Sequence, residues 1–389
     1  MLLTNGRLIF PDRIAEDLSL RMTDGKIAVI GTEAPQPEDE VFDLEGNFLA
    51  PGFIDLHVHG GAGHDAMEGT PEAFRAICDF HLGGGTTSLL LTTVTAPLEE
   101  ITHVVRQING ARAQLSQVAG AHVEGPFISP AKHGAQRAEF ILEPKPEFVE
   151  QLLAISPGPQ RVTLAPELPG AAELIASLRM NGIAGSGGHS DAWEEDAEAG
   201  FSCGMNQVTH TFNCMSSLRR RDGKRVPGLL EFALSEPKIF CELIADGHHV
   251  GKTLMRLLYR AKRAEGICLV TDATAGAGLP NDSRFTLGGS DCVVRDGACW
   301  LADGSALAGS ASRMIDLVQR MIQEVGVPVH EAIRMATETP ARAMGWTNKG
   351  MLEVGRAADL VVLSPDLKVL RTYCLGTLQG ADAFSKNAA

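Results

Sequence analysis

The sequence predicts an α/β protein, a (β/α)8 TIM-type barrel with a small β-sandwich domain built from both chain ends. Three observations support this fold class. Short β-rich runs alternate with helical stretches through the middle of the chain. Both ends instead carry short strands with tight turns. Histidines and carboxylates recur where the middle strands end, which is where barrels of this kind carry their chemistry.

The chain ends are predicted to form strands joined by tight turns. Near the amino terminus, Asn5-Gly6 and Asp24-Gly25 separate short β-rich runs, and both pairs are strong hairpin signals. Similar runs return at 359–363 and 369–373. Because neither piece is large enough for a core of its own, we expect the two ends to meet in one small sandwich.

Between the ends, the hydrophobic pattern predicts a closed barrel. Eight strands in about 220 residues fit a (β/α)8 barrel better than an open doubly wound sheet. The strands are expected at 53–58, 88–94, 119–123, 162–166, 183–188, 207–210, 240–245 and 267–271. Helices are expected at 71–82, 98–114, 171–180, 192–200, 251–264, 310–325 and 329–344. The predicted limits are 52–348 for the barrel and 1–51 with 349–380 for the sandwich.

Composition narrows the classes of function. The 389 residues carry a formal net charge of −14, which argues against nucleic acid or an anionic membrane as a partner. No apolar run reaches the roughly 18 residues of a membrane span, and we expect no signal peptide. The eight cysteines form no Cys-x-x-Cys pair, so reduced thiols and a cytoplasmic location are expected. No Gly-x-Gly-x-x-Gly or P-loop supports a nucleotide site.

The first predicted barrel strand ends in two histidines, His57 and His59. Residues two apart in a strand point to the same face, so both side chains could hold one metal ion. A buried strand with two hydrogen-bonded histidines is the alternative. The motif alone does not decide between the two interpretations.

Four more predicted strands end in similar side chains. Glu124 follows the third strand, and His189 follows the fifth. His210 follows the sixth strand and Asp272 the eighth. Each alone could be structural, since Asp272 could cap a helix. A barrel gathers its strand ends at one mouth, so together they predict a site for one or two divalent metal ions, and their ligand types suit zinc, iron or manganese.

A basic stretch, 219–225, stands out against the acidic background. A solvated loop is the simple interpretation. A binding site for an anionic group is the more specific interpretation.

The ordered motifs resemble the amidohydrolase superfamily. They are Pro-Gly-Phe-Ile-Asp-x-His-x-His, His-x-Glu-Gly-Pro-Phe, Gly-His-Ser, Thr-His-x-x-Asn-x-Met and Thr-Asp-Ala-Thr. Each motif is weak alone, but the ordered set is specific and covers nearly the whole chain. Within the superfamily, the set is similar to the deacetylases of N-acetylated amino-sugar phosphates.

The resemblance implies metal and catalytic roles. It makes Glu124, His189 and His210 the ligands of the main metal. His57 and His59 would serve a second ion, with Glu124 able to bridge the two. Some family members lack the His-x-His pair and use one ion, so the resemblance leaves one or two ions open. Asp272 matches the catalytic aspartate.

The resemblance also implies a substrate site. Asn213 and Cys214 match a turn whose backbone amides meet the sugar phosphate. Arg225 matches an arginine that reaches the phosphate from a neighbouring subunit, which implies a homodimer, and His249 matches another substrate contact. The family's substrate histidine is replaced by Gln136 here. That departure leaves open how the carbonyl is polarised and which sugar is preferred.

The implied reaction is metal-dependent hydrolysis of the N-acetyl amide of N-acetylglucosamine 6-phosphate, giving glucosamine 6-phosphate and acetate. A bound divalent metal can lower the pKa of a water to about 7 and can polarise the carbonyl. Asp272 would take the water's proton and return it to the departing nitrogen.

Three alternatives are weaker. One is deacetylation of N-acetylgalactosamine 6-phosphate or another N-acyl amino-sugar phosphate. The second is a dihydroorotase- or hydantoinase-like cyclic amidase, which usually bridges its metals with a modified lysine after strand four, where 164–167 holds no lysine. The third is a metal-free scaffold protein, which would usually have lost ligands that this chain keeps.

Overall fold

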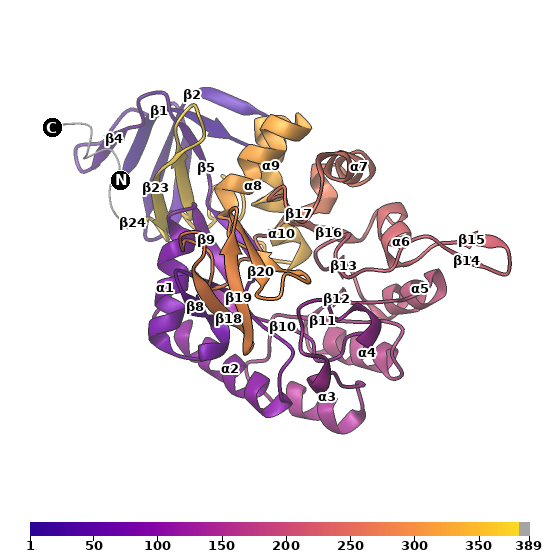
Figure 1. The fold of residues 1–389 in the computed structure, drawn as a ribbon. Coiled ribbons are helices and arrows are strands. Elements are labelled where there is room, and N and C mark those ends of the chain that lie inside the picture. Colours follow the sequence, from indigo (N-terminus) through magenta and orange to yellow (C-terminus); the bar gives the residue numbers. More distant parts are fainter. Residues whose placement is uncertain (381–389) are drawn as a thin grey trace.

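The computed structural model describes residues 1–380 and contains the predicted barrel (Figure 1). Its sheet has eight parallel strands in the order β6-β9-β10-β11-β12-β13-β16-β17, so all the predicted barrel strands are confirmed. Their bounds are β6 Phe53–Val58, β9 Thr86–Thr93, β10 Val118–Glu124, β11 Arg161–Leu164, β12 Ala184–Gly187, β13 Gln207–Val208, β16 Phe240–Leu243 and β17 Ile267–Leu269.

The barrel closes through hydrogen bonds between β6 and the residues that directly follow β17. The backbone N–H of Asp272 donates to the carbonyl of His57 at 3.0 Å. The fully buried carboxylate of Asp55 accepts from the hydroxyl of Thr271 at 2.6 Å. Burial raises the pKa of Asp55 to about 7, although the Thr271 hydrogen bonds partly offset it. The closure therefore sets the His57 end of β6 beside Asp272.

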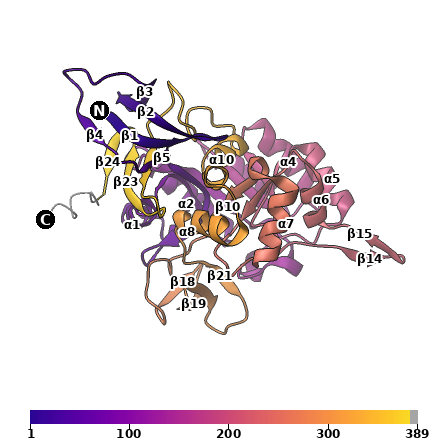
Figure 2. The ribbon, with the colours of Figure 1, turned by 90° about the horizontal axis from the view of Figure 1, so that it is seen from above.

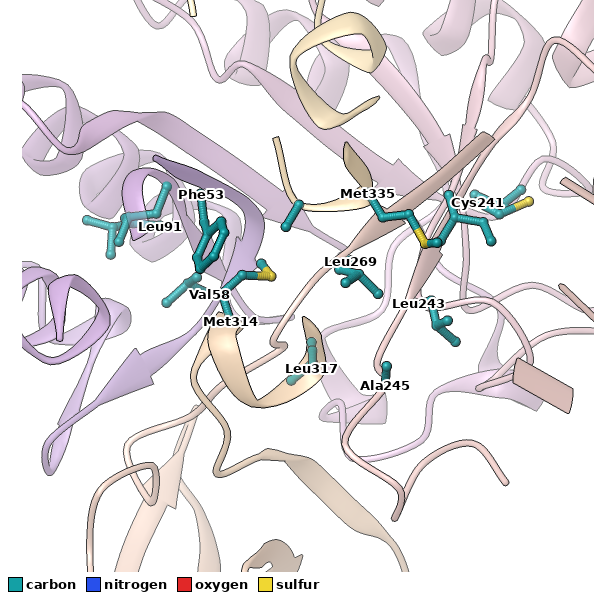
Figure 3. Close-up of a cluster of buried hydrophobic side chains, with 14 of the residues drawn as sticks. Phe53, Val58, Leu91, Cys241, Leu243, Ala245, Leu269, Met314, Leu317 and Met335 are labelled. Atoms are coloured by element: carbon teal, nitrogen blue, oxygen red, sulfur yellow. The ribbon is translucent and has the colours of Figure 1, made fainter. Parts of the chain in front are cut away.

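The main hydrophobic core lies between the strands and the helices around them (Figure 3). Leu91 and Leu243 contribute from strands β9 and β16. Met314 and Leu317 of α8 (Met314–Arg320) belong to the same cluster. Burying each such side chain stabilises the fold by roughly 1.5–3 kcal/mol, so the core holds the strand ends in fixed positions.

The predicted helices are present, with two corrections. The confirmed ones are α1 Pro71–Leu82, α2 Leu98–Ala111, α4 Ala171–Met180, α5 Glu194–Cys203 and α7 Lys252–Lys262. The helix expected at 310–325 starts only at α8 and ends in a π-helical turn, Met321–Val325. The helix expected at 329–344 is split into α9 (Val329–Met335) and α10 (Glu338–Ala343). Pro340 has no N–H to continue the helix, and the carbonyl of Ala336 accepts from Ile54 instead, at 2.8 Å.

Several elements were not expected from the sequence. Two are the short helices α3 (Pro146–Leu153) and α6 (Leu229–Ser235). A hairpin of β14 (Arg219–Arg221) and β15 (Lys224–Val226) projects from the body of the molecule (Figures 1 and 2). A four-stranded antiparallel sheet comprises β18 Arg284–Leu287, β19 Ser290–Arg295, β20 Ala298–Leu301 and β21 Leu307–Ser310. The last strand, β21, ends at Ser310, the first residue of the helix that was expected at 310–325.

The two chain ends meet in one sheet, which fits the predicted sandwich domain. Its order is β24-β23-β22-β5-β1-β2-β3, with β4 pairing β1. The bounds are β1 Leu2–Ile9, β2 Ile14–Thr23, β3 Lys26–Gly31, β4 Val41–Asp43, β5 Phe48–Pro51, β22 Leu360–Leu363, β23 Val369–Cys374 and β24 Thr377–Gln379. The antiparallel pair β5–β22 joins the ends. The domain limits, 1–51 with 349–380 against 52–348, stay a prediction.

One predicted hairpin is wrong. Asp24-Gly25 does join β2 to β3, but Asn5-Gly6 lies inside β1, where the pairing with β2 is irregular. Asn5 has a φ of 52°, and its side-chain amide donates to Asp43 at 2.9 Å. A Cβ at position 6 would lie 2.4 Å from a methyl of Leu44. The Asn-Gly pair therefore forms a bulge, and the missing side chain of Gly6 leaves room for Leu44.

The structure also describes the state of the cysteines and the character of the helices. The eight cysteines all lie within residues 1–380 and are free thiols. In the same part of the chain, no helix has both the length and the apolar character needed to cross a bilayer.

His81 on α1 is expected to make stability depend on pH. Its Nε2 pairs with the carbonyl of Gly60 at 3.0 Å. Burial lowers the pKa of His81 to about 4, below the roughly 6.5 of an unfolded histidine. The unfolded chain therefore binds the extra proton first, so stability is lost as pH falls from about 6.5 to about 4.

Denaturant unfolding at pH 7.5 and pH 5 measures this effect. Protonation linked to His81 alone should lower the free energy of unfolding by about 2 kcal/mol at pH 5. His81→Gln keeps an N–H donor but does not titrate. Between the two pH values, the free energy of unfolding of this variant should therefore fall by about 2 kcal/mol less than that of the wild type. Equal losses in the variant and the wild type would exclude His81 as the cause.

Candidate active site

The predicted ligands meet at the carboxyl ends of the barrel strands. His57, His59 and Glu124 form one group, and Glu124, His189 and His210 form a second. In each group, the candidate ligand atoms all lie within 4.8 Å of one another, and every residue is buried. Glu124 belongs to both groups. The structure therefore brings together all five side chains that the sequence proposed as ligands.

The distances within the two groups fit a shared divalent ion. One carboxylate oxygen of Glu124, Oε1, lies 3.3 Å from Nε2 of His189 and 3.1 Å from Nε2 of His210. Its other oxygen, Oε2, lies 3.2 Å from Nε2 of His59. Within each histidine pair, His57–His59 and His189–His210, the two Nε2 atoms are 3.1 Å apart. Zinc–ligand bonds of about 2.0–2.1 Å in a tetrahedron place neighbouring ligand atoms roughly 3.3 Å apart.

The outer ring nitrogens orient the histidines. Nδ1 of His59 pairs with the carbonyl of Thr92 at 3.2 Å, and Nδ1 of His189 with the carbonyl of Lys132 at 2.8 Å. Since a carbonyl can only accept, each Nδ1 carries the hydrogen. With Nδ1 held in this way, Nε2 is the nitrogen that would give up its proton and bind an ion, which is the usual arrangement of metal-binding histidines.

Three of the residues that follow barrel strands have strained backbones. His189, His210 and Asp272 have φ values of 45°, 29° and 49°, in the left-handed region that residues other than glycine rarely adopt. Such conformations cost roughly 1–3 kcal/mol each and persist where the surrounding structure over-determines them. The sharp turn after each strand directs the side chain into the mouth of the barrel.

The charges of the site act strongly on Asp272. Its Oδ1 lies 3.3 Å from Nε2 of both His57 and His59. Burial would raise the pKa of Asp272, but the charge of His57 and a hydrogen bond from His59 lower it to about 2. Burial likewise would lower the pKa of His59, yet its hydrogen bonds to Asp272 and Glu124 raise it to about 9. Asp272 is therefore ionised at neutral pH and able to accept a proton.

A cavity of about 230 Å³ lies over these groups. Its lining includes four of the five predicted substrate contacts, Gln136, Asn213, Cys214 and His249. The fifth, Arg225, lies exposed on strand β15 and does not line the cavity of its own chain. The lining residues are His59, Glu124, Gly134, Ala135, Gln136, His189, His210, Asn213, Cys214, His249, Asp272, Leu287, Ala306, Leu307 and Gly309.

Gln136 contacts a proposed metal ligand. Its amide oxygen accepts from the backbone N–H of Thr95 at 2.7 Å, which fixes the orientation of the amide. Its amide nitrogen then donates to Oε2 of Glu124 at 2.6 Å. Gln136 thus contacts Glu124 directly and also lines the cavity.

His249 is held by an acidic neighbour. Its Nδ1 pairs with the carboxylate of Asp246 at 2.7 Å. Burial would lower the pKa of His249, but the hydrogen bond and charge of Asp246 raise it. This shift favours the cationic form of the imidazole, which suits an anionic group of a ligand at the cavity wall.

Sequence reasoning missed two parts of the site. The β18–β21 sheet adds Leu287, Leu307 and Gly309 to the cavity wall. Gly288-Gly289 and Asp296-Gly297, which join its first three strands, are hairpin signals that could have revealed it. The other part is a buried pair inside the barrel, Arg161 and Glu242, which no motif indicated.

Fold and site together define a (β/α)8 barrel protein with a candidate metal site of histidines and a carboxylate at the strand ends. The amidohydrolase family model matches residues 48–379. The chain belongs to the amidohydrolase family, as the resemblance of its motifs predicted.

Named relatives match nearly the whole chain. The N-acetylglucosamine-6-phosphate deacetylase of Lysinibacillus sphaericus is 34% identical, covering 94% of this chain and 94% of that protein. The N-acetylgalactosamine-6-phosphate deacetylase of Escherichia coli O157:H7 is 36% identical, covering 96% of this chain and 97% of that protein. The solved N-acetylglucosamine-6-phosphate deacetylase from Pasteurella multocida has a TM-score of 0.91 at 33% identity, covering 98% of this chain and 99% of that one.

Proposed function

We propose that the protein hydrolyses the N-acetyl amide of N-acetylglucosamine 6-phosphate to glucosamine 6-phosphate and acetate in the cytoplasm. The observation that carries this proposal is the position of Asp272, 3.3 Å from two candidate metal-binding histidines and on the wall of a cavity. The similarity to deacetylases of amino-sugar phosphates supports the choice of substrate.

The proposed metal site uses buried side chains that lie close together. Glu124, His189 and His210 would hold the main divalent ion, with zinc favoured over iron or manganese. His57 and His59 would hold a second ion, with Glu124 shared between the two groups. When bound, a divalent ion supplies an activated water at neutral pH and polarises the amide carbonyl.

Asp272 would serve as base and then as acid. It accepts the proton of the attacking water as the new C–O bond forms. It then delivers that proton to the sugar nitrogen as the C–N bond breaks. The water's oxygen ends in acetate. One of its protons reaches the sugar nitrogen through Asp272, and the other leaves the new carboxyl group as it ionises and protonates the free amine, so the reaction needs no further reactant.

The sugar phosphate would lie at the far side of the cavity from the metal groups. We propose that Asn213 and Cys214 contact it through their backbone, that His249 contributes charge, and that Gln136 contacts the sugar while holding Glu124. Binding energy from the phosphate would orient the amide for attack. Arg225 would come from the partner subunit of a homodimer, because it lies exposed on a hairpin that projects from its own chain.

Arg225→Ala is expected to raise KM for the phosphorylated sugar by about 10- to 100-fold, which corresponds to losing one hydrogen bond between charged groups. KM for the unphosphorylated sugar should not change. Lys224→Ala removes a neighbouring charge on the opposite face of the hairpin and serves as the control. Equal effects of Arg225→Ala on both sugars would refute the phosphate assignment.

The preferred sugar is tested separately. The Escherichia coli relative is named for N-acetylgalactosamine 6-phosphate, so that epimer is the second candidate substrate. Acetate release from both phosphorylated sugars, and from other N-acyl amino-sugar phosphates, should give the highest kcat/KM for the glucosamine compound. A higher value for the galactosamine compound would reverse the assignment, and hydrolysis of none of them would overturn the proposed function.

A further inference from the structure

A buried ion pair crosses the barrel interior near the proposed metal site. Glu242 projects from β16 and Arg161 from β11, and the two strands are separated in the sheet by β12 and β13. Their side chains are 2% and 0% exposed and form a direct ion pair through Nη1 of Arg161 and Oε1 of Glu242. Nη2 of Arg161 also donates to the hydroxyl of Ser186 at 2.7 Å.

The second oxygen of Glu242 contacts both candidate metal groups. Its Oε2 accepts from Nδ1 of His57 at 3.3 Å. The same oxygen accepts from the backbone N–H of His210 at 3.1 Å. One carboxylate thus holds a side chain of the first group and the backbone of a residue of the second.

His57 differs from the other proposed ligands in this respect. His59 and His189 direct Nδ1 to backbone carbonyls, which carry no net charge. Nδ1 of His210 has no partner among the described residues. His57 alone among the four directs Nδ1 to a carboxylate within residues 1–380, and such a partner both fixes the tautomer and makes the ligand nitrogen more basic.

Stability alone does not account for the pair. Desolvating two charges is costly, and replacing a buried ion pair with well-packed apolar side chains is often neutral or stabilising. The contact with His57 offers a functional reason for keeping the charges, because a carboxylate held by an arginine cannot turn away from the histidine.

We propose that Glu242, held by Arg161, is a positioning residue that keeps His57 competent to bind a second divalent cation beside His59 and Glu124. This inference rests on the proposed metal-dependent function and goes beyond it by assigning the second ion to this interior pair. Glu242 touches neither the substrate cavity nor the proposed ion directly, so it acts through His57.

The test measures Zn²⁺ binding to metal-free protein by titration against a chromophoric chelator, separately from turnover. The wild type should bind two ions. Glu242→Gln should weaken the second by about 10- to 100-fold and leave the first unchanged. With its amide oxygen facing Arg161, the glutamine turns its NH₂ toward His57, which favours the tautomer with hydrogen on Nε2 and blocks that ligand atom. A merely structural role would weaken both ions together or only lower the Tm.

Glu242→Gln leaves the charge of Arg161 unpaired and could unfold the protein. The double variant Arg161→Met, Glu242→Leu removes both charges while retaining apolar bulk, and should show the same selective loss. His57→Ala marks the full loss of the second ion. A wild type with one ion, or either Glu242 variant with both affinities unchanged, overturns the inference. A wild type that releases no acetate overturns the proposed function instead, whatever the variants bind.

Discussion

Replacing Asp272 with asparagine is expected to lower kcat by about 10²- to 10⁴-fold, the range for a lost general acid–base group. Asparagine has nearly the shape of aspartate but cannot take a proton from water or return it to the sugar nitrogen. Metal content should stay that of the wild type, because the two ligand groups do not include Asp272. Acetate release and elemental analysis of the same sample measure both quantities.

Asp65→Asn is the matched control for Asp272. Asp65 is also a buried carboxylate close to the barrel mouth, but it caps a short helical turn and accepts from the backbone N–H of Met67 at 2.8 Å. Its replacement should reduce stability and leave kcat nearly unchanged. Turnover close to normal in Asp272→Asn would remove Asp272 from the mechanism.

Replacing Glu124 with glutamine is expected to abolish metal binding and lower kcat by at least about 10³-fold, since the metal contributes several kcal/mol to catalysis. Glu124 belongs to both ligand groups, so its charge is lost from each at once. The amide of Gln136, which donates to Glu124, would also face a donor in one orientation of the new side chain. Elemental analysis after desalting, with acetate release, measures the change.

Glu331→Gln is the control for this substitution. Glu331 lies on the outer helix α9 and accepts from the hydroxyl of Tyr259 at 2.7 Å. This variant should keep both its metal and its turnover. A Glu124→Gln protein that retains stoichiometric metal would show that the ion is held elsewhere.

The barrel could be predicted from sequence because its strands are short apolar runs. Leu89, Leu90 and Leu91, for example, form a continuous buried run, which is typical of strands covered on both faces. The grouping of the candidate ligands could be predicted because each lies at the end of such a run, and a closed barrel brings the strand ends together at one mouth. Asp272 is the clearest case, since barrel closure alone sets it beside His57.

The remaining features depend on contacts between residues far apart in the sequence, which a local sequence pattern does not reveal. Arg161 and Glu242 are charged residues in otherwise apolar strands, and they balance each other only after the barrel closes. The split of the predicted 329–344 helix likewise involves a residue far away in the sequence. The backbone N–H of Ile54 donates to the carbonyl of Ala336. The role of Gln136 becomes visible only when its loop lies against Glu124.

Anomalous diffraction at the absorption edge of the metal, from crystals of metal-loaded protein, tests the central claim most directly. The proposed site predicts a peak about 2.0–2.2 Å from Nε2 of His189, Nε2 of His210 and a carboxylate oxygen of Glu124, with Asp272 beside it. A metal bound by other residues, or no peak among these three side chains in an active preparation, would contradict it.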